Sequence, residues 1–189
     1  MAKTKNPYKK YIKAIIEYHA EYKLAIERAG DDYYICDGIS LLKLPQSIYC
    51  EFFPGADMPF VHLIDGESIE YPSGSFVGQK KYKNELADLF DRIVVKDYAN
   101  FTKLVAEDIS EYNHKVKRKI RIAIIGNEIA GFNEEYILAA KEFAGVFLGT
   151  KSTAPIKWNN HIMGMALMPI RSKAFRQDIE KIQKAIINL

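Results

Sequence analysis

The chain has 189 residues, enough for one well-filled core or for two small lobes that share one. Hydrophobic residues make up 48% and charged residues 27%, which excludes a disordered chain, and no run reaches the ~20 apolar residues of a membrane span. The net charge of +3 is small for a protein that binds nucleic acid through phosphate contacts alone.

Two features indicate a cytoplasmic protein. Cys36 and Cys50 have no CxxC spacing and are expected to be reduced core residues, with a disulfide between them as the alternative. The lysine-rich start, residues 1–10, leads into an amphipathic segment and not into the apolar run of a signal peptide.

The first predicted element is a helix. Asn6-Pro7 is typical of a helix start, and Gly30 can end the helix. The apolar residues that recur at helical spacing between them are Tyr8, Tyr11, Ile12, Ile15, Tyr22 and Ile26.

Three glycine dipeptides predict tight hairpin turns, because each tolerates the positive φ angles that such turns require. They are Asp37-Gly38, Asp65-Gly66 and Gly126-Asn127. The expected flanking strands are Tyr33–Cys36 with Ser40–Leu44, Val61–Ile64 with Glu67–Tyr71, and Ile120–Ile125 with Glu128–Phe132. Ser47–Phe53 reads as a further strand.

The middle of the chain, about 80–113, is expected to be a helical insertion. Lys80–Asp91 has a helical pattern, Ile93–Val95 reads as a short strand, and Asp97 can cap a second helix that extends to Tyr112. A basic run, Lys115 to Lys119, follows, and it is interpreted as a solvated connection, with nucleic-acid binding as the alternative.

The last third predicts one helix, three strands and a final helix. Asn133 is expected to cap the helix, with Glu134 and Glu135 in its first turn and Gly145 at its end. Val146–Leu148, Ala154–Trp158 and Ile162–Met168 predict strands, and Pro169 closes the last one. Residues 172–189 predict an amphipathic helix. The fold class is therefore α+β.

No catalytic or metal motif is present. The sequence contains no GxGxxG, GxxxxGK[ST], HExxH or GxSxG, and its four histidines are isolated from one another. We therefore expect no enzyme activity, no metal and no cofactor; an enzyme whose site is scattered along the chain is the alternative. Met163, Met165 and Met168 are expected to belong to the core, with an adaptable binding surface as the alternative.

Three short phrases occur in order in the last third of the chain. They are Gly131-Phe132-Asn133-Glu134-Glu135-Tyr136-Ile137-Leu138, a Thr-Ala-Pro strand start at 153–155, and Leu167-Met168-Pro169-Ile170-Arg171. The first is similar to the phrase GFNxxYLL of bacterial DNA sliding clamps, the polymerase III β subunits, and the other two follow in the clamp order. Residues 118–171 thus resemble the closing module of these clamps.

The resemblance implies a single clamp-like domain over 1–189, built from two units of a helix and antiparallel strands. Unit one would span about 7–71 and unit two about 118–171, with the insertion at 80–113 between them and the added helix 172–189 after them. Clamps encircle DNA and bind short peptides of replication and repair proteins. The implied residues here are Lys115, Lys117, Arg118 and Lys119 for DNA, and Met168 and Pro169 for a peptide groove.

Two functions follow as hypotheses. The first is a non-enzymatic clamp-fold binding protein that self-associates and acts near DNA replication or repair of a phage or mobile element. The second is a clamp-derived interaction module that no longer encircles DNA. Glu134, Glu135 and Glu142 against Lys141 predict an acidic surface on the helix over 133–144, which suits duplex DNA poorly. Whether DNA is bound stays open.

Overall fold

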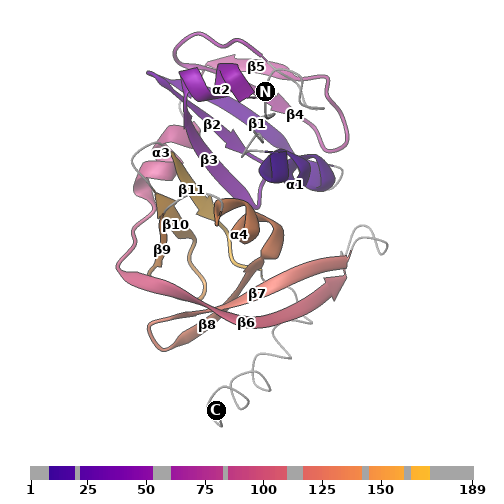
Figure 1. Cartoon of the computed structure of the whole chain (residues 1–189). Coiled ribbons are helices and arrows are strands. Elements are labelled where there is room, and N and C mark those ends of the chain that lie inside the picture. Colours follow the sequence, from indigo (N-terminus) through magenta and orange to yellow (C-terminus); the bar gives the residue numbers. More distant parts are fainter. Residues whose placement is uncertain are drawn as a thin grey trace, which may run out of the picture.

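The computed structural model describes residues 9–19, 22–52, 61–82, 85–109, 117–141, 145–159 and 163–170 (Figure 1). The predicted helix over 172–189, the helix opening at Asn6-Pro7, and Lys115 lie outside these ranges.

The first half of the fold is a helix followed by antiparallel strands. Its elements are α1 (Lys9–His19), β1 (Leu24–Ala29), β2 (Asp32–Cys36), β3 (Ser40–Pro45), α2 (Gln46–Phe52), β4 (Glu67–Tyr71) and β5 (Gln79–Tyr82). Tight turns join β1, β2 and β3, and Gly30 and Gly38 take φ angles of 60° and 83° in them. The hairpin predicted around Asp37-Gly38 is confirmed.

The second half adds a short helix, a long hairpin and another helix with three strands. Its elements are α3 (Glu85–Arg92), β6 (Asp97–Ile109), β7 (Lys117–Ile125), β8 (Glu128–Asn133), α4 (Glu134–Ala140), β9 (Val146–Gly149), β10 (Ile156–Asn159) and β11 (Gly164–Leu167). The predicted hairpin at Gly126-Asn127 and the Asn133 cap are confirmed.

All these strands form one sheet, in the order β5-β4-β1-β2-β3-β11-β10-β9-β6-β7-β8. α1 is followed by the meander β1-β2-β3, and α4 by the meander β9-β10-β11. The two meanders meet where β3 pairs with β11, from Ser40 opposite Leu167 to Lys43 opposite Gly164. A single hydrogen-bonded ladder therefore joins parts of the chain that are far apart in sequence.

The main core lies under α1 and α4, which pack beside each other on one face of the sheet (Figure 1). Tyr11 of α1 and Tyr136 of α4 approach with ring centroids 5.3 Å apart. On β2, Tyr33 and Ile35 are fully buried in this core, because alternate residues of a strand point to one face.

The opposite face of the sheet carries α3. Tyr34 lies between Tyr33 and Ile35 in sequence and packs with Phe90 of α3, Leu41 and Ala166 in a second cluster. β2 is thus buried on both faces, which explains its run of apolar residues.

The helix expected from Asp97 is wrong: residues 97–109 form β6, which pairs with β7 from Ala99 to Phe101 and from Val105 to Ile109. Tyr98, Leu104 and Val105, which helical spacing would have buried, are 65%, 42% and 42% exposed. The ladder with β7 outweighs the helical pattern because tertiary pairing overrides local propensity. Of the described residues in the expected helical insertion, only 85–92 form a helix, and 93–96 form no strand.

Three further element predictions are corrected. The first helix ends at His19, and Ile26 lies in β1, because that stretch pairs with β2 on one side and β4 on the other. Ser47–Phe53 was expected as a strand, but 46–52 forms α2, whose Tyr49 ring stacks on Tyr33 at 3.9 Å. Residues 61–64 form no strand beside β4.

Candidate functional site

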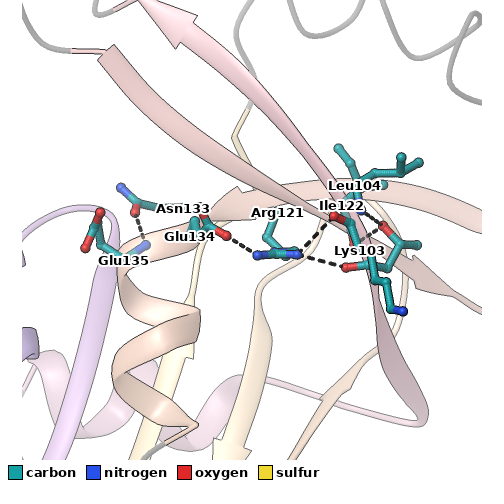
Figure 2. Close-up of polar contacts among 8 residues, drawn as sticks. Lys103, Leu104, Arg121, Ile122, Asn133, Glu134 and Glu135 are labelled. Carbon is teal, nitrogen blue, oxygen red and sulfur yellow. Dashed lines mark hydrogen bonds and ion pairs between the residues drawn. The ribbon is translucent and has the colours of Figure 1, made fainter.

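Arg121 joins α4 to an irregular stretch of β6 (Figure 2). Its guanidinium forms an ion pair with the Glu134 carboxylate in the first turn of α4. The same side chain donates to the backbone oxygens of Thr102 and Lys103, at 3.3 and 3.2 Å. The register of β6 against β7 shifts between Phe101 and Val105, so Arg121 holds the backbone carbonyls of this irregularity.

The surface of α4 differs from the expected one. Glu134 is only 6% exposed and is neutralised by Arg121. Asn133 caps the helix, accepting from the backbone N–H of Glu135 at 2.9 Å, and Glu135 is exposed. Glu142 lies outside the described residues. Glu134 thus has a structural role. The sequence analysis did not predict its partner, Arg121, although a lone charge between Ile120 and Ile122 was a signal for a buried ion pair.

The residues predicted for DNA binding begin a strand. Lys117 and Arg118 open β7, where the structure describes only their backbone, and Lys119 is exposed. In the ladder, Lys119 lies opposite Glu107, and Arg118 lies opposite Asp108. The run therefore has two acidic positions opposite it in the backbone register of this ladder, so this part of the sheet is not purely basic in sequence.

The two residues predicted to line a peptide groove, Met168 and Pro169, follow β11 and differ in their exposure. Met168 is 41% exposed, while Pro169 is buried. The backbone N–H of Met168 donates to the Ile39 oxygen at 2.9 Å, and that of Ile170 donates to the Gly131 oxygen at 2.8 Å. Met163 and Met165 are buried, as expected for core residues, whereas Met168 is not.

A cleft of about 360 Å³ lies where β6 and β9 diverge; we call it the β6–β9 cleft. Its lining combines aromatic and apolar side chains with one lysine and one asparagine. The lining residues are Tyr98, Ala99, Asn100, Phe101, Ala140, Lys141, Gly145, Val146, Phe147 and Trp158. No sequence motif pointed to this cleft, because its walls come from three strands and the end of a helix.

A buried polar cluster ties α1, the β2–β3 turn and α4 together. The Asp37 carboxylate accepts from the backbone N–H groups of Ile39 and Ser40, at 3.0 and 2.7 Å, and from the Tyr136 hydroxyl. Tyr11 and Ser40 share a hydrogen bond of 2.7 Å. Burial raises the pKa of Asp37 and of both tyrosines, so the tyrosine hydroxyls stay neutral.

Two described side chains of types that often perform chemistry, Cys36 and His19, are buried or held by backbone contacts. Burial raises the pKa of the Cys36 thiol to about 11, so it is not a thiolate near neutral pH. His19 is buried, and its ring nitrogens lie 3.1 and 3.0 Å from the backbone oxygens of Tyr22 and Ser75. Among the described residues, no three His, Cys, Asp or Glu side chains gather closely enough to hold a metal ion.

The chain as a whole is similar to known proteins in structure but not in sequence. No protein-family model matches the chain, and no curated protein matches it. The Helicobacter pylori beta clamp bound to a DNA ligase peptide is similar in structure, with 10% identity and a TM-score of 0.38. A putative DNA polymerase III beta subunit from Eubacterium rectale is similar too, with 12% identity and a TM-score of 0.36.

Each match covers 87% of this chain and 63% of the clamp. The chain thus matches less than two thirds of the length of either clamp. The sequence resemblance of residues 118–171 to bacterial clamps is thus accompanied by a loose similarity in structure. TM-scores below 0.5 do not support a statement about function, so the proposals below rest on the contacts within this chain. In the described part of the chain, no helix is long and apolar enough to cross a membrane.

Proposed function

We propose that the chain is a non-enzymatic clamp-fold binding protein of the cytoplasm, acting through protein–protein contacts in DNA replication or repair of a phage or mobile element. One observation carries the proposal: the residues with the clamp-like phrases form a closed unit. That unit runs from Gly131 through α4 and β9–β11 to Ile170, and a backbone hydrogen bond of 2.8 Å joins these two residues.

The order of elements supports a two-unit domain of the kind that the resemblance implies. Each of α1 and α4 precedes a three-stranded meander, and the meanders meet at the β3–β11 ladder. The two helices pack against each other on one face. We infer that the domain consists of two related units, with α3 and β6 inserted between them.

The exposed Met168 side chain is the proposed contact point of this unit. Its backbone is fixed by Ile39 and its neighbour Pro169 is buried, so the side chain is presented from a rigid segment. A flexible thioether on a rigid backbone suits contact with apolar partners.

The second candidate, a clamp-derived module that no longer encircles DNA, is favoured by the charges on the predicted DNA-binding surface. Glu107 and Asp108 lie opposite Lys119 and Arg118 in the backbone register of the β6–β7 ladder, so two acidic positions accompany the basic run. Glu135 is exposed on α4. Neither feature provides the basic face that a DNA-lining surface needs.

Binding to nicked circular DNA and to the same DNA after linearisation separates the two candidates. A ring that encircles DNA stays on the circle and slides off the linear form. A variant in which Lys115, Lys117, Arg118 and Lys119 are changed to Gln should then lose salt-dependent binding. Sedimentation of the chain with and without residues 172–189 gives the oligomeric state.

A ring-sized assembly with topology-dependent binding supports encirclement. A monomer or dimer that binds neither DNA form supports the interaction module. For the contact point, Met168→Asp should abolish self-association seen by sedimentation, with Val77→Asp, at 80% exposure, as the control. Unchanged self-association in the Met168 variant would remove Met168 from the contact surface.

A further inference from the structure

The β6–β9 cleft is a fork in the sheet. β6 pairs with β9 only through Asp97 and Tyr98, opposite Gly149 and Leu148. From Ala99 onward, β6 pairs with β7 on its other side. Among the described residues no strand pairs with β6 on the cleft side beyond Tyr98, so its backbone edge is open to a further strand there.

The walls of the fork are aromatic and closely packed. Phe101 and Phe147 meet edge to face with ring centroids 5.2 Å apart, and Phe147 lies 6.4 Å from Trp158. Gly145 lies so close to the indole that a Cβ there would come within 2.3 Å of Trp158 Nε1. At the rim, Tyr98 and Val146 are 65% and 53% exposed. The cleft thus has a fixed aromatic floor and an apolar entrance.

Among the described residues that line the cleft, Lys141 carries the one charge. It follows the end of α4 and is exposed, and no carboxylate is among these described lining residues. In the described part of the chain, no acidic side chain forms an ion pair with Lys141. A ligand that complements this cleft is apolar and carries an acidic group near Lys141.

We propose that the β6–β9 cleft binds an extended segment of a partner protein, with apolar side chains on the aromatic floor and an acidic residue at Lys141. The segment adds as a strand to the open edge of β6 beside Ala99, Asn100 and Phe101. Main-chain hydrogen bonds to this edge provide affinity, and the aromatic floor with Lys141 provides specificity.

Single-stranded nucleic acid suits the cleft less well, although aromatic rings also stack on bases. Binding a phosphate backbone needs a track of basic side chains beside the stacking rings. Of the lining residues that the structure describes, Lys141 is the one basic side chain. An open strand edge, in contrast, is matched by a peptide backbone.

This inference does not depend on the contact at Met168, which does not line the cleft. The two proposals can therefore fail separately. Trp158 lines the cleft and is the only tryptophan of the chain, so its fluorescence reports on occupancy.

The experiment selects random dodecapeptides from a display library on the full chain and titrates the selected peptides while Trp158 fluorescence is followed. Selected peptides should carry apolar residues in alternate positions and at least one Asp or Glu. Val146→Arg should weaken binding about tenfold or more, because it places a charge at the apolar entrance. Lys141→Glu should weaken binding of the same acidic peptides.

Two controls make the outcome decisive. Val77→Arg changes a valine that is 80% exposed and does not line the cleft, and its affinity should equal that of the unmodified chain. Met168→Asp should likewise leave peptide binding at the cleft unchanged. Circular dichroism establishes that each variant is folded.

Three results would overturn the proposal. One is that no peptide is selected. Another is that the selected peptides bind the Val146→Arg chain as well as the unmodified one. The third is that oligothymidylate, and not peptide, changes the Trp158 fluorescence in a manner that Val146→Arg abolishes, which would assign the cleft to single-stranded nucleic acid.

Discussion

Asp37 shows how one buried carboxyl links the two halves of the domain. It lies in the β2–β3 turn, is fully buried, and accepts a hydrogen bond from Tyr136 of α4. Burial raises its pKa above the ordinary value of 3.8, against the lowering effect of the hydrogen bonds it accepts. The folded state therefore binds a proton more tightly at this position than the unfolded state does.

The sign of the pH dependence follows from this difference. The stabilisation from the Asp37 proton is fully present below the unfolded pKa and is lost as pH rises through the raised folded pKa. In Asp37→Asn, which titrates no group there, this loss should be absent. We expect the free energy of unfolding of the unmodified chain to fall relative to the variant as the pH rises from about 4, the pKa of an unfolded Asp, through the raised folded pKa, measured by urea unfolding. A constant difference between the two chains over this range would contradict the prediction.

A second prediction concerns the ion pair between Arg121 and Glu134. The side chains are 17% and 8% exposed, so removing one partner leaves a largely desolvated charge. Glu134→Gln should destabilise the fold by roughly 3 kcal/mol in urea unfolding. Arg121→Met combined with Glu134→Gln should recover part of this loss, because no buried charge then remains unpaired.

The matched control is the exposed pair of Arg92 and Asp88 on α3, with side chains 81% and 65% exposed and 3.6 Å apart. Arg92→Met should change stability by about 0.5 kcal/mol or less. Equal effects at the two pairs would mean that Arg121 and Glu134 are no more desolvated in solution than the surface pair.

Among the elements, α3 depends on a carboxylate from a distant strand. Glu27 of β1 is 1% exposed, and its two oxygens accept from the backbone N–H groups of Leu86 and Ala87, at 2.9 and 3.0 Å. This contact caps the start of α3 and brings Phe90 onto the sheet face around Tyr34. The position of α3 therefore depends on a cap from β1 as well as on its own sequence.

Replacing this cap should loosen α3 alone. Glu27→Leu should cost about 1 to 2 kcal/mol and speed amide hydrogen exchange at Leu86 and Ala87, while Glu27→Gln, which keeps one acceptor oxygen, should have a smaller effect. Glu51→Gln, at an exposed position of α2, is the control and should leave these amides unchanged. Unaltered exchange at Leu86 in the Glu27→Leu chain would show that packing holds α3 without the cap.

For the whole molecule, the shared core predicts that the two halves unfold together. The β3–β11 ladder and the contact of α1 with α4 place residues from both halves in one hydrophobic cluster. Amides in the middle of the sheet, at Ile35, Leu42, Trp158 and Met165, should therefore exchange with one common free energy of opening. The edge strand β5, whose residues are all exposed, should open at lower cost and serves as the internal control. Two distinct free energies for the two halves would show that they fold separately.

The sequence by itself determined the α+β class, the hairpins at Asp37-Gly38 and Gly126-Asn127, the Asn133 cap and the strands after α4, because glycine turns, caps and short apolar runs act locally. Only the tertiary structure decided that residues 97–109 form β6, because its helical pattern is outweighed by a ladder with a strand that follows later in the chain. The same holds for Glu27, Arg121 and the β6–β9 cleft. Each depends on partners that are close in space and distant in sequence, and a local pattern contains no information about them.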